Sequence, residues 1–353
     1  MPDVLQWVCG LLLLLIGAEL SVRAAVSLAT TLRVRPLLIG LTFVAFGSSA
    51  PQMAVGLQAA FTASADIAVG SVVGSNIFNV LVTLGLCALV IPLRITRQLV
   101  RLEIPLMIAA SALVLALSWN AVLGALDGVI LLSGLLIYLL TVLRQSGQRF
   151  AYRPSSGTEH SRTMGQVLLR LGALLGGIAC VGLGSHLLVA ASVVIALDLG
   201  LSERIIGLTV IAVSTSLPAL TTSLIAALRG ERDIAVGNVI GSNLFNLLGV
   251  LGITALIAPV PLSVSPNALA FDIPVMLGVA ALCLPLFYSG YRITRAEGLM
   301  LLGLYLAYGL HIVAFTTGMP LAEKLERLMI QFVLPVFALI VLFNTLKAWR
   351  RQH

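Results

Sequence analysis

The chain has 353 residues, of which 59% are hydrophobic and only 10% are charged, and its formal net charge is +7. A mean hydropathy of +1.09 excludes a soluble domain, because globular proteins carry about 25% charged residues. Runs of about twenty apolar residues recur along the whole length, and each is long enough to cross a bilayer. The composition therefore predicts an all-α polytopic membrane protein.

The apolar runs predict about eleven transmembrane helices. We expect them at residues 4–24, 36–61, 66–92, 101–118, 122–143, 165–196, 203–228, 234–259, 268–288, 297–316 and 328–347. Glycine, serine and proline interrupt the second, third, seventh and eighth spans, which is typical of helices that form a transport site. No basic segment precedes the first apolar run, so we expect the first span to be retained rather than cleaved as a signal peptide.

One long hydrophilic stretch divides the chain into two halves. Residues 144–164 contain proline, serine, glycine and charged side chains, which predict a cytoplasmic linker. We expect a first five-helix repeat at 1–143, a second at 165–318, and an appended transmembrane helix with a basic tail at 319–353. Because five is an odd number, the second repeat enters the membrane from the opposite side, and the two repeats are inverted.

The arginines predict how the chain is oriented. They gather after the odd-numbered spans, whereas the connections after spans two, four and eight carry almost no basic residues. The positive-inside rule then places the N-terminus outside and the C-terminus in the cytoplasm. The same arginines also serve to anchor helices to lipid headgroups, with the same orientation. The positive charge thus indicates a lipid bilayer rather than nucleic acid as partner, and the oligomeric state stays open.

Two segments match each other at a constant offset of 167 residues. Phe46–Gln52 and Asp66–Asn79 in the first half correspond to Val213–Ala219 and Asp233–Asn246 in the second half. Both copies place proline, hydroxyl and amide side chains inside apolar helices. A repeat of this kind marks a transporter whose site lies between its two halves.

The repeated segments predict a cation site made of neutral oxygens. Pro51 and Pro218 each remove a helical hydrogen bond and displace a carbonyl, which must find a partner in hydrocarbon. The oxygen donors around these breaks are the hydroxyls of Ser48, Ser49, Thr215 and Ser216 and the backbone carbonyls of Ala45 and Ala212. A spacing of four residues puts a hydroxyl and an amide on one helix face in Ser75 with Asn79 and in Ser242 with Asn246. Such oxygens suit hard cations such as Na⁺ and Ca²⁺.

The same residues have a purely structural interpretation, in which prolines kink helices, glycines pack them, and polar side chains bond between them. Two motifs at one fixed offset favour the cation site over this alternative. Asp66 and Asp233 begin the third and eighth spans, and we expect them to cap helices rather than bind ions. Glu19 lies inside the first span, where we expect it to pair with Arg23 one turn later.

These motifs resemble the cation/calcium exchanger superfamily, which includes the membrane domains of sodium/calcium exchangers. The similarity covers about residues 1–316 and is greatest to short bacterial members that lack a large regulatory loop. It implies two inverted five-helix halves, alternating access in which two helices slide against a fixed bundle, and a bacterial inner membrane location. The positions that match the ion-contacting residues of this family are Ala45, Ser48, Ser49, Ser75, Asn79, Ala212, Thr215, Ser216, Ser242 and Asn246.

The chain departs from this family directly after its two prolines. The family carries glutamate at both positions, whereas this chain has Gln52 and Ala219, and many prokaryotic members carry aspartate in place of Asn246. No carboxylate remains in the matched site, although Gln52 and Asn246 still offer amide oxygens. A divalent ion deep in the membrane needs carboxylates as ligands and as countercharge. We therefore expect the site to hold Na⁺ and to hold Ca²⁺ only weakly.

Three functions remain open at this point. The first is a cation antiporter of the sodium/calcium exchanger type without a resident cofactor, which handles monovalent ions better than Ca²⁺. The second is a non-transporting pseudo-exchanger that acts as a membrane binding or regulatory subunit; the missing charge favours it, and the retained neutral ligands argue against it. The third is a transporter of another monovalent cation or of another solute. An enzyme is not expected, because the sequence has no phosphate loop, nucleotide fingerprint or catalytic cluster.

Overall fold

The structure of the chain, a computed structural model, describes residues 2–32, 34–61, 65–146, 164–198, 215–288 and 290–317, with the single positions Lys324, Leu328 and Gln331. Within this part of the chain, eight helical segments are long and apolar enough to cross a membrane. The prediction of a helical membrane protein is confirmed. The count of eleven spans and the inversion of the repeats stay predictions, and the linker and the span at 328–347 lie almost entirely outside the described residues.

The described helices alternate between α-helical pieces and short π-helical or 3₁₀ pieces, which are labelled η. The first half contains α1 (Pro2–Leu32), α2 (Pro36–Ile39), η1 (Gly40–Val44), α3 (Ala45–Ser48), α4 (Ala50–Ala60), α5 (Ala65–Phe78), η2 (Asn79–Leu84), α6 (Gly85–Val90), η3 (Leu99–Glu103), α7 (Ile104–Leu117), η4 (Ser118–Asn120) and α8 (Ala125–Ser146). The second half contains α9 (Met164–Asp198), α12 (Leu217–Leu228), α13 (Arg232–Leu244), η6 (Phe245–Val250), α14 (Leu251–Ile257), η7 (Ala268–Asp272), α15 (Ile273–Tyr288) and α16 (Arg295–Thr317).

The helices that carry the repeated Gly-Ser-Asn motifs lie at the centre of the bundle. In the most apolar stretches of Ala68–Val90 and Arg232–Ile257, 83% of the residues are buried, against 22% in that of Ala125–Arg144 on α8. Large apolar side chains such as Leu126 and Leu169 face outward, while serines and asparagines are buried inside. This distribution is the reverse of a soluble protein and fits a surface in contact with lipid.

Two short strand pairs join the halves of the chain. β1 (Leu93–Arg94) pairs antiparallel with β4 (Arg292–Ile293), and β2 (Val122–Leu123) pairs antiparallel with β3 (Leu262–Ser263). In each pair one strand precedes the predicted linker and the other follows it. The two halves are therefore intertwined and pack as one bundle rather than as separate domains.

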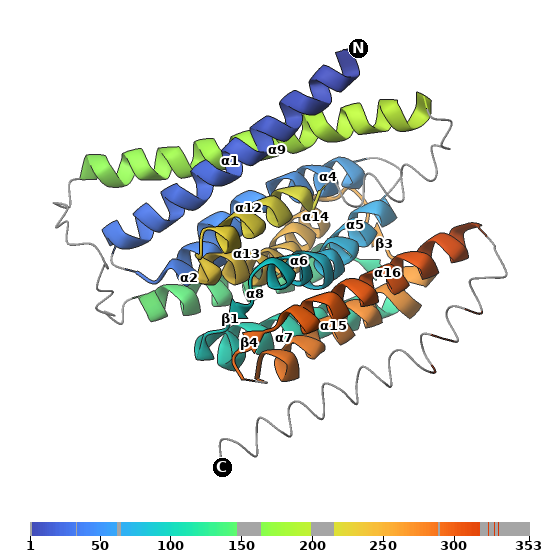
Figure 1. Cartoon of the computed structure of the whole chain (residues 1–353). Coiled ribbons are helices and arrows are strands. Elements are labelled where there is room, and N and C mark those ends of the chain that lie inside the picture. The colour runs from blue at the N-terminus through green and yellow to red at the C-terminus, as the bar shows by residue number, and fades with distance from the viewer. Residues whose placement is uncertain are drawn as a thin grey trace.

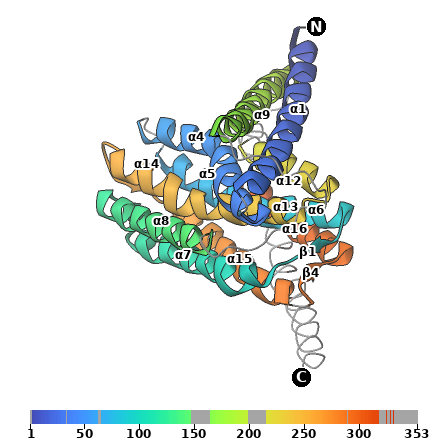
Figure 2. The ribbon, with the colours of Figure 1, turned by 90° about the vertical axis from the view of Figure 1, so that its left-hand side faces the viewer.

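The long helices α1 and α9 lie side by side across the rest of the bundle (Figures 1 and 2). Glycines at their crossing bring the two backbones into contact. A Cβ atom added to Gly184 would lie 2.4 Å from the backbone nitrogen of Leu14, and one added to Gly10 would lie 2.5 Å from that of Leu188. Because no side chain fits between them, α1 and α9 form a closely packed pair.

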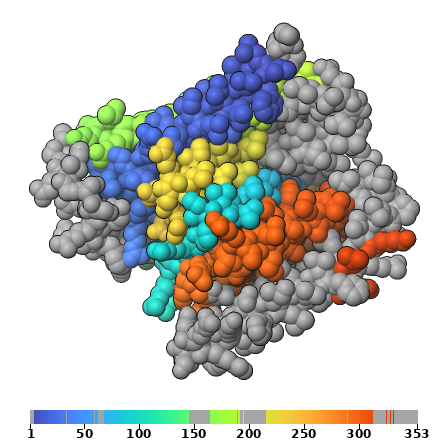
Figure 3. Space-filling model, viewed as in Figure 1, coloured from blue at the N-terminus to red at the C-terminus, as the bar shows by residue number. Residues whose placement is uncertain are grey.

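An ion pair connects this helix pair to the bundle. Glu19 pairs with Arg23, as predicted, and also with Arg229 at the end of α12, whose Nε donates to Glu19 Oε2 at 3.0 Å. The space-filling view shows α12 directly beside α1 (Figure 3). The first span was predicted to end near residue 24, but α1 continues to Leu32. Since Glu19 neutralises Arg23, this arginine does not mark the end of the helix.

We expect Glu19→Gln to weaken the attachment of α1 to α12. The pair is partly exposed, so the melting temperature in detergent should fall by only about 2 °C at low salt. The difference should vanish in about 1 M choline chloride, which screens the pair without adding Na⁺. Equal melting temperatures of variant and wild type at low salt would show that the pair contributes nothing to this contact.

Candidate functional site

The site begins at Ser49 and Ser216, two serines that are related by the 167-residue offset and that each precede the start of a helix. Ser49 separates α3 from α4 with φ −88° and ψ −5°, and Ser216 precedes α12 with φ −95° and ψ −10°. Pro51 and Pro218 are the second residues of α4 and α12, where the missing amide hydrogen costs no helical bond. The prediction of a mid-helix proline is corrected for Pro51, which stands at the start of α4 after the turn at Ser49. Pro218 stands at the start of α12, and the segment directly before Thr215 lies outside the described residues.

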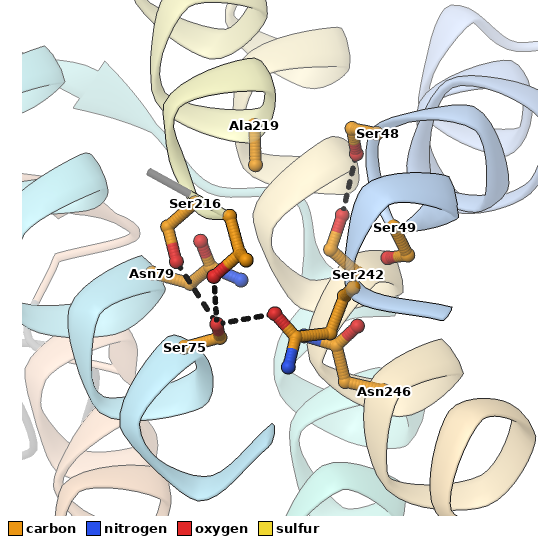
Figure 4. A pocket seen from close by; sticks show the side chains of 10 residues that line it. Ser48, Ser49, Ser75, Asn79, Ser216, Ala219, Ser242 and Asn246 are labelled. Atoms are coloured by element: carbon orange, nitrogen blue, oxygen red, sulfur yellow. Dashed lines mark hydrogen bonds between the residues drawn. The ribbon is translucent and has the colours of Figure 1, made fainter. Parts of the chain in front are cut away.

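A small pocket lies where these helix starts meet the central helices α5 and α13. Figure 4 shows its side chains converging from both halves of the chain. Its volume is about 10 Å³, which is room for about one water molecule or one dehydrated cation. It is lined by Ser48, Ser49, Gln52, Ser75, Asn79, Thr215, Ser216, Ala219, Ser242 and Asn246. Every one of these side chains is neutral.

The sequence-predicted residues are thus brought together, with two exceptions. Ala45 does not line the pocket itself, but its carbonyl oxygen lies 3.1 Å from Ser48 Oγ and 3.4 Å from Ser242 Oγ. Ala212 lies outside the described residues. Ala219, which was expected to contribute no side-chain ligand, places only its methyl group in the wall of the pocket.

One cluster of hydroxyls lies on each side of the pocket. On one side Ser48 Oγ is 2.9 Å from Ser242 Oγ. On the other side Ser75 Oγ is 3.3 Å from Thr215 Oγ1 and accepts a hydrogen bond from Ser216 Oγ at 3.1 Å. Each cluster therefore combines residues from both halves of the chain (Figure 4).

Gln52 supports the second cluster with both ends of its amide. Its Nε2 donates to Ser71 Oγ at 2.7 Å, and its Oε1 accepts from Ser75 Oγ at 2.9 Å. The side chain is 1% exposed, so it cannot rotate without breaking both bonds. The oxygen that was expected as a direct ion ligand is thus already bonded to a serine of the pocket.

Four asparagines connect the two central helices. Asn76 and Asn243, 167 positions apart, each donate from Nδ2 to the backbone carbonyl of the other at 3.3 Å. Asn79 Nδ2 donates to Asn243 Oδ1 and Asn246 Nδ2 donates to Asn76 Oδ1, both at 3.0 Å. These bonds engage the amide nitrogens of Asn79 and Asn246, and the amide oxygens of both residues are left out of them.

Three oxygens of the pocket residues are buried and have no hydrogen-bond partner: Asn79 Oδ1, Asn246 Oδ1 and Ser49 Oγ. Buried polar atoms are normally bonded, and an unpaired one costs free energy. Two amide oxygens and a hydroxyl around a cavity of ionic size can compensate this cost by binding a cation. They suit a hard cation such as Na⁺ by the chemistry of the donor set.

No acidic side chain is among the described residues that line this pocket. Asp233 occupies the first turn of α13, whose N-cap residue is Glu231 without a side-chain cap bond. The prediction that Asp233 caps the helix is therefore wrong, although its charge still favours the helix N-terminus. The side chain of Asp66 lies outside the described residues. Within the described ranges, no group of three or more His, Cys, Asp and Glu side chains could hold a metal ion.

Sequence reasoning missed the supporting asparagines. Asn76 and Asn243 repeat at the same offset as the predicted ligands, so the repeat itself could have identified them. Asn238 is fully buried and its Oδ1 accepts from Ser48 Oγ at 2.9 Å. The residue at the equivalent position of the first half is Ser71. Because the two residues differ, a comparison of the repeats for identical residues does not identify Asn238.

A broken helix beside a buried, oxygen-lined pocket is typical of a polytopic membrane transporter. The family model of the sodium/calcium exchanger protein matches residues 3–144 and 169–314. The chain therefore belongs to the sodium/calcium exchanger protein family, and the resemblance inferred from the motifs is confirmed. It is an integral membrane antiporter of this family.

Individual relatives and a solved structure agree with this assignment. CaxA of Alkalimonas amylolytica, which is described as an antiporter, is 38% identical over 305 residues, 85% of this chain and 95% of the relative. The sodium/calcium exchanger MaX1 of Methanosarcina acetivorans is 30% identical over 334 residues, with 85% and 95% covered. A structure of the sodium-calcium exchanger NCX_Mj, soaked with Na⁺ and Ca²⁺, aligns with a TM-score of 0.75 at 28% identity, covering 90% of this chain and 98% of that one.

Proposed function

We propose that the chain exchanges cations across the membrane by binding Na⁺ in the neutral pocket, and that it handles Ca²⁺ poorly. The three unpaired oxygens of Ser49, Asn79 and Asn246 around a cavity of about 10 Å³ carry this proposal. Neutral oxygens can replace the hydration of a monovalent ion. A divalent ion in the same place lacks the carboxylates that would supply its countercharge.

The transport step is alternating access, in which the α1/α9 pair slides against the remaining bundle. The backbone contact of α1 with α9 supports movement as a unit, since Gly10 and Gly17 face Leu188 and Val181 without side chains between them. A Cβ on Gly47, in the broken helix beside the pocket, would meet the side chain of Ile178 on α9 at 2.4 Å. Movement of α9 would therefore displace Ile178 against the helix that carries Gly47, directly beside the pocket.

The two halves act as inverted repeats with boundaries at 1–143 and 165–318. Support comes from the reciprocal bonds of Asn76 with Asn243 and from the crossed strand pairs.

The linker at 144–164 and the C-terminus are cytoplasmic, and the N-terminus is outside. A relative, YrbG of Escherichia coli, is named an inner membrane protein and is 38% identical over 280 residues, 77% of this chain and 85% of the relative.

Thermal unfolding in detergent tests whether the pocket binds ions. Added Na⁺ should raise the melting temperature, because a ligand at about 100 times its Kd stabilises the folded state by about 2.7 kcal/mol. Choline at equal ionic strength is the control, and Ca²⁺ should give a smaller shift. A Na⁺ response without flux in vesicles would indicate the pseudo-exchanger. If no ion changes the melting temperature, Na⁺ is excluded as the bound ligand, and a transporter of a different solute is favoured.

A further inference from the structure

The two sides of the pocket carry different residues at equivalent positions. At the offset of 167, Gln52 corresponds to Ala219 and Ser71 corresponds to Asn238. The first half therefore has a long amide after its proline and a short hydroxyl on the central helix. The second half has the short residue after its proline and the amide on the central helix.

Both amides nevertheless make the same kinds of contact. Gln52 is anchored through Nε2 by Ser71 Oγ. Asn238 is anchored through Nδ2 by the Ala219 carbonyl at 3.2 Å and by Ser223 Oγ at 2.8 Å. Ser223 corresponds to Gly56 in the first half, so the hydroxyl that bonds Asn238 has no equivalent in the half that carries Ser71. Each amide nitrogen is therefore bonded to a neighbouring oxygen.

The amide oxygens then face the hydroxyls of the pocket. Gln52 Oε1 accepts from Ser75 Oγ at 2.9 Å. Asn238 Oδ1 accepts from Ser48 Oγ at 2.9 Å and from Ser242 Oγ at 3.5 Å. Ser75 and Ser242 are themselves equivalent at the offset of 167, so an amide oxygen lies near the same serine on either side, in short contact with Ser75 and in a longer one with Ser242.

This contact determines which part of a hydroxyl faces the cavity. A serine hydroxyl has one hydrogen and two lone pairs. When the hydrogen of Ser48 points at Asn238 Oδ1, Ser242 can donate its own hydrogen to Ser48 Oγ. One lone pair of Ser48 and both lone pairs of Ser242 then remain for a cation. Ser48 and Ser242 both line the pocket, whereas Asn238, fully buried behind them, does not.

We propose that Asn238 is a positioning residue for cation binding, which turns the lone pairs of Ser48 and Ser242 into the pocket and replaces, from the neighbouring helix, the side chain that Ala219 lacks. This inference rests on the proposed function, since it assumes that the pocket binds Na⁺. It adds a residue that decides how strongly the second side of the pocket can hold an ion.

The two halves supply the experiment. Asn238→Ser copies Ser71, and Ala219→Gln added to it copies Gln52, so the double variant carries the first-half arrangement on both sides. In Na⁺ titrations of the melting temperature, Asn238→Ser should raise the half-saturating Na⁺ concentration about tenfold, and the double variant should return to within about threefold of wild type. Thr254→Val removes a buried hydroxyl outside the pocket and should leave the titration unchanged.

The outcomes separate the inference from the proposed function. If Na⁺ does not raise the melting temperature of the wild type, both the proposed function and the role of Asn238 are contradicted. A wild-type response that Asn238→Ser leaves unchanged would overturn the inference alone. A weakened response that Ala219→Gln does not restore would also overturn it, because a merely structural role of Asn238 predicts no such rescue.

Asn238→Asp keeps the test decisive if Asn238→Ser does not fold. The substitution preserves shape and replaces the amide by a carboxylate behind Ser48 and Ser242. It should favour Ca²⁺ over Na⁺ by at least about tenfold relative to wild type, since the added charge acts more strongly on a divalent ion. An unchanged ratio of the two affinities would contradict a role of Asn238 at the ion site.

Discussion

Replacing Gln52 and Ala219 together with glutamate is expected to make the chain transport Ca²⁺. Both positions line the pocket, so the two carboxylates would add oxygen ligands and countercharge where the wild type has neither. A gain of only 1.4 kcal/mol in Ca²⁺ binding corresponds to about tenfold in affinity. Sodium-driven Ca²⁺ uptake into proteoliposomes should therefore rise at least about tenfold over wild type.

Ala219→Gln is the matched control for this experiment, because it adds the length of glutamate without the charge. Its Ca²⁺ uptake should remain at the wild-type level. Ser71 accepts a bond from Gln52 in the wild type, and its hydroxyl can rotate and donate to the carboxylate introduced by Gln52→Glu. Equal Ca²⁺ uptake by the double glutamate variant and by the control would show that charge at these positions does not determine selectivity.

Replacing Asn79 and Asn246 together with leucine is expected to abolish Na⁺ binding. Leucine keeps the approximate shape of asparagine but removes both unpaired amide oxygens. Each oxygen bonded to a charge is worth about 1.5–3 kcal/mol, so loss of the pair should weaken Na⁺ binding by about 100-fold or more. The measurement is the increase in melting temperature that Na⁺ produces over choline.

The same variant also loses the bonds of Asn79 to Asn243 and of Asn246 to Asn76. Its melting temperature without Na⁺ should therefore be lower, and only the Na⁺-dependent increment is compared. Ser111→Ala, which removes a buried hydroxyl bonded to the Met107 carbonyl, should keep that increment. A full Na⁺ increment in the leucine variant would place the bound ion outside this pocket.

The pocket was accessible to sequence reasoning because its chemistry is repeated. Ser75 with Asn79 and Ser242 with Asn246 are four residues apart on helices, which fixes their common face before any tertiary contact is known. Their matching offset then indicates one shared site. Ala212, the linker and the span at 328–347 lie outside the described residues or almost so, and they stay predictions.

What the sequence could not reveal depends on contacts between distant segments. Arg229 meets Glu19 across 210 residues, while the local spacing indicates only Arg23. Asn238 has no identical residue at the equivalent position of the first half. There the amide oxygen that accepts a hydrogen bond from a pocket serine comes from Gln52, which lies on another helix. The position of Pro51 in a new helix depends on the break at Ser49, which a continuous apolar run does not predict.

Sodium exchange and sodium-driven Ca²⁺ uptake, measured with radioactive tracers in the same proteoliposomes beside protein-free vesicles, test the neutral cation site most directly. We predict saturable Na⁺/Na⁺ exchange and Ca²⁺ uptake at less than about a tenth of its rate, since a tenfold preference needs only 1.4 kcal/mol. No Na⁺ exchange in vesicles that contain folded protein would contradict the antiporter. Ca²⁺ uptake as fast as Na⁺ exchange would contradict the selectivity assigned to a pocket without carboxylates.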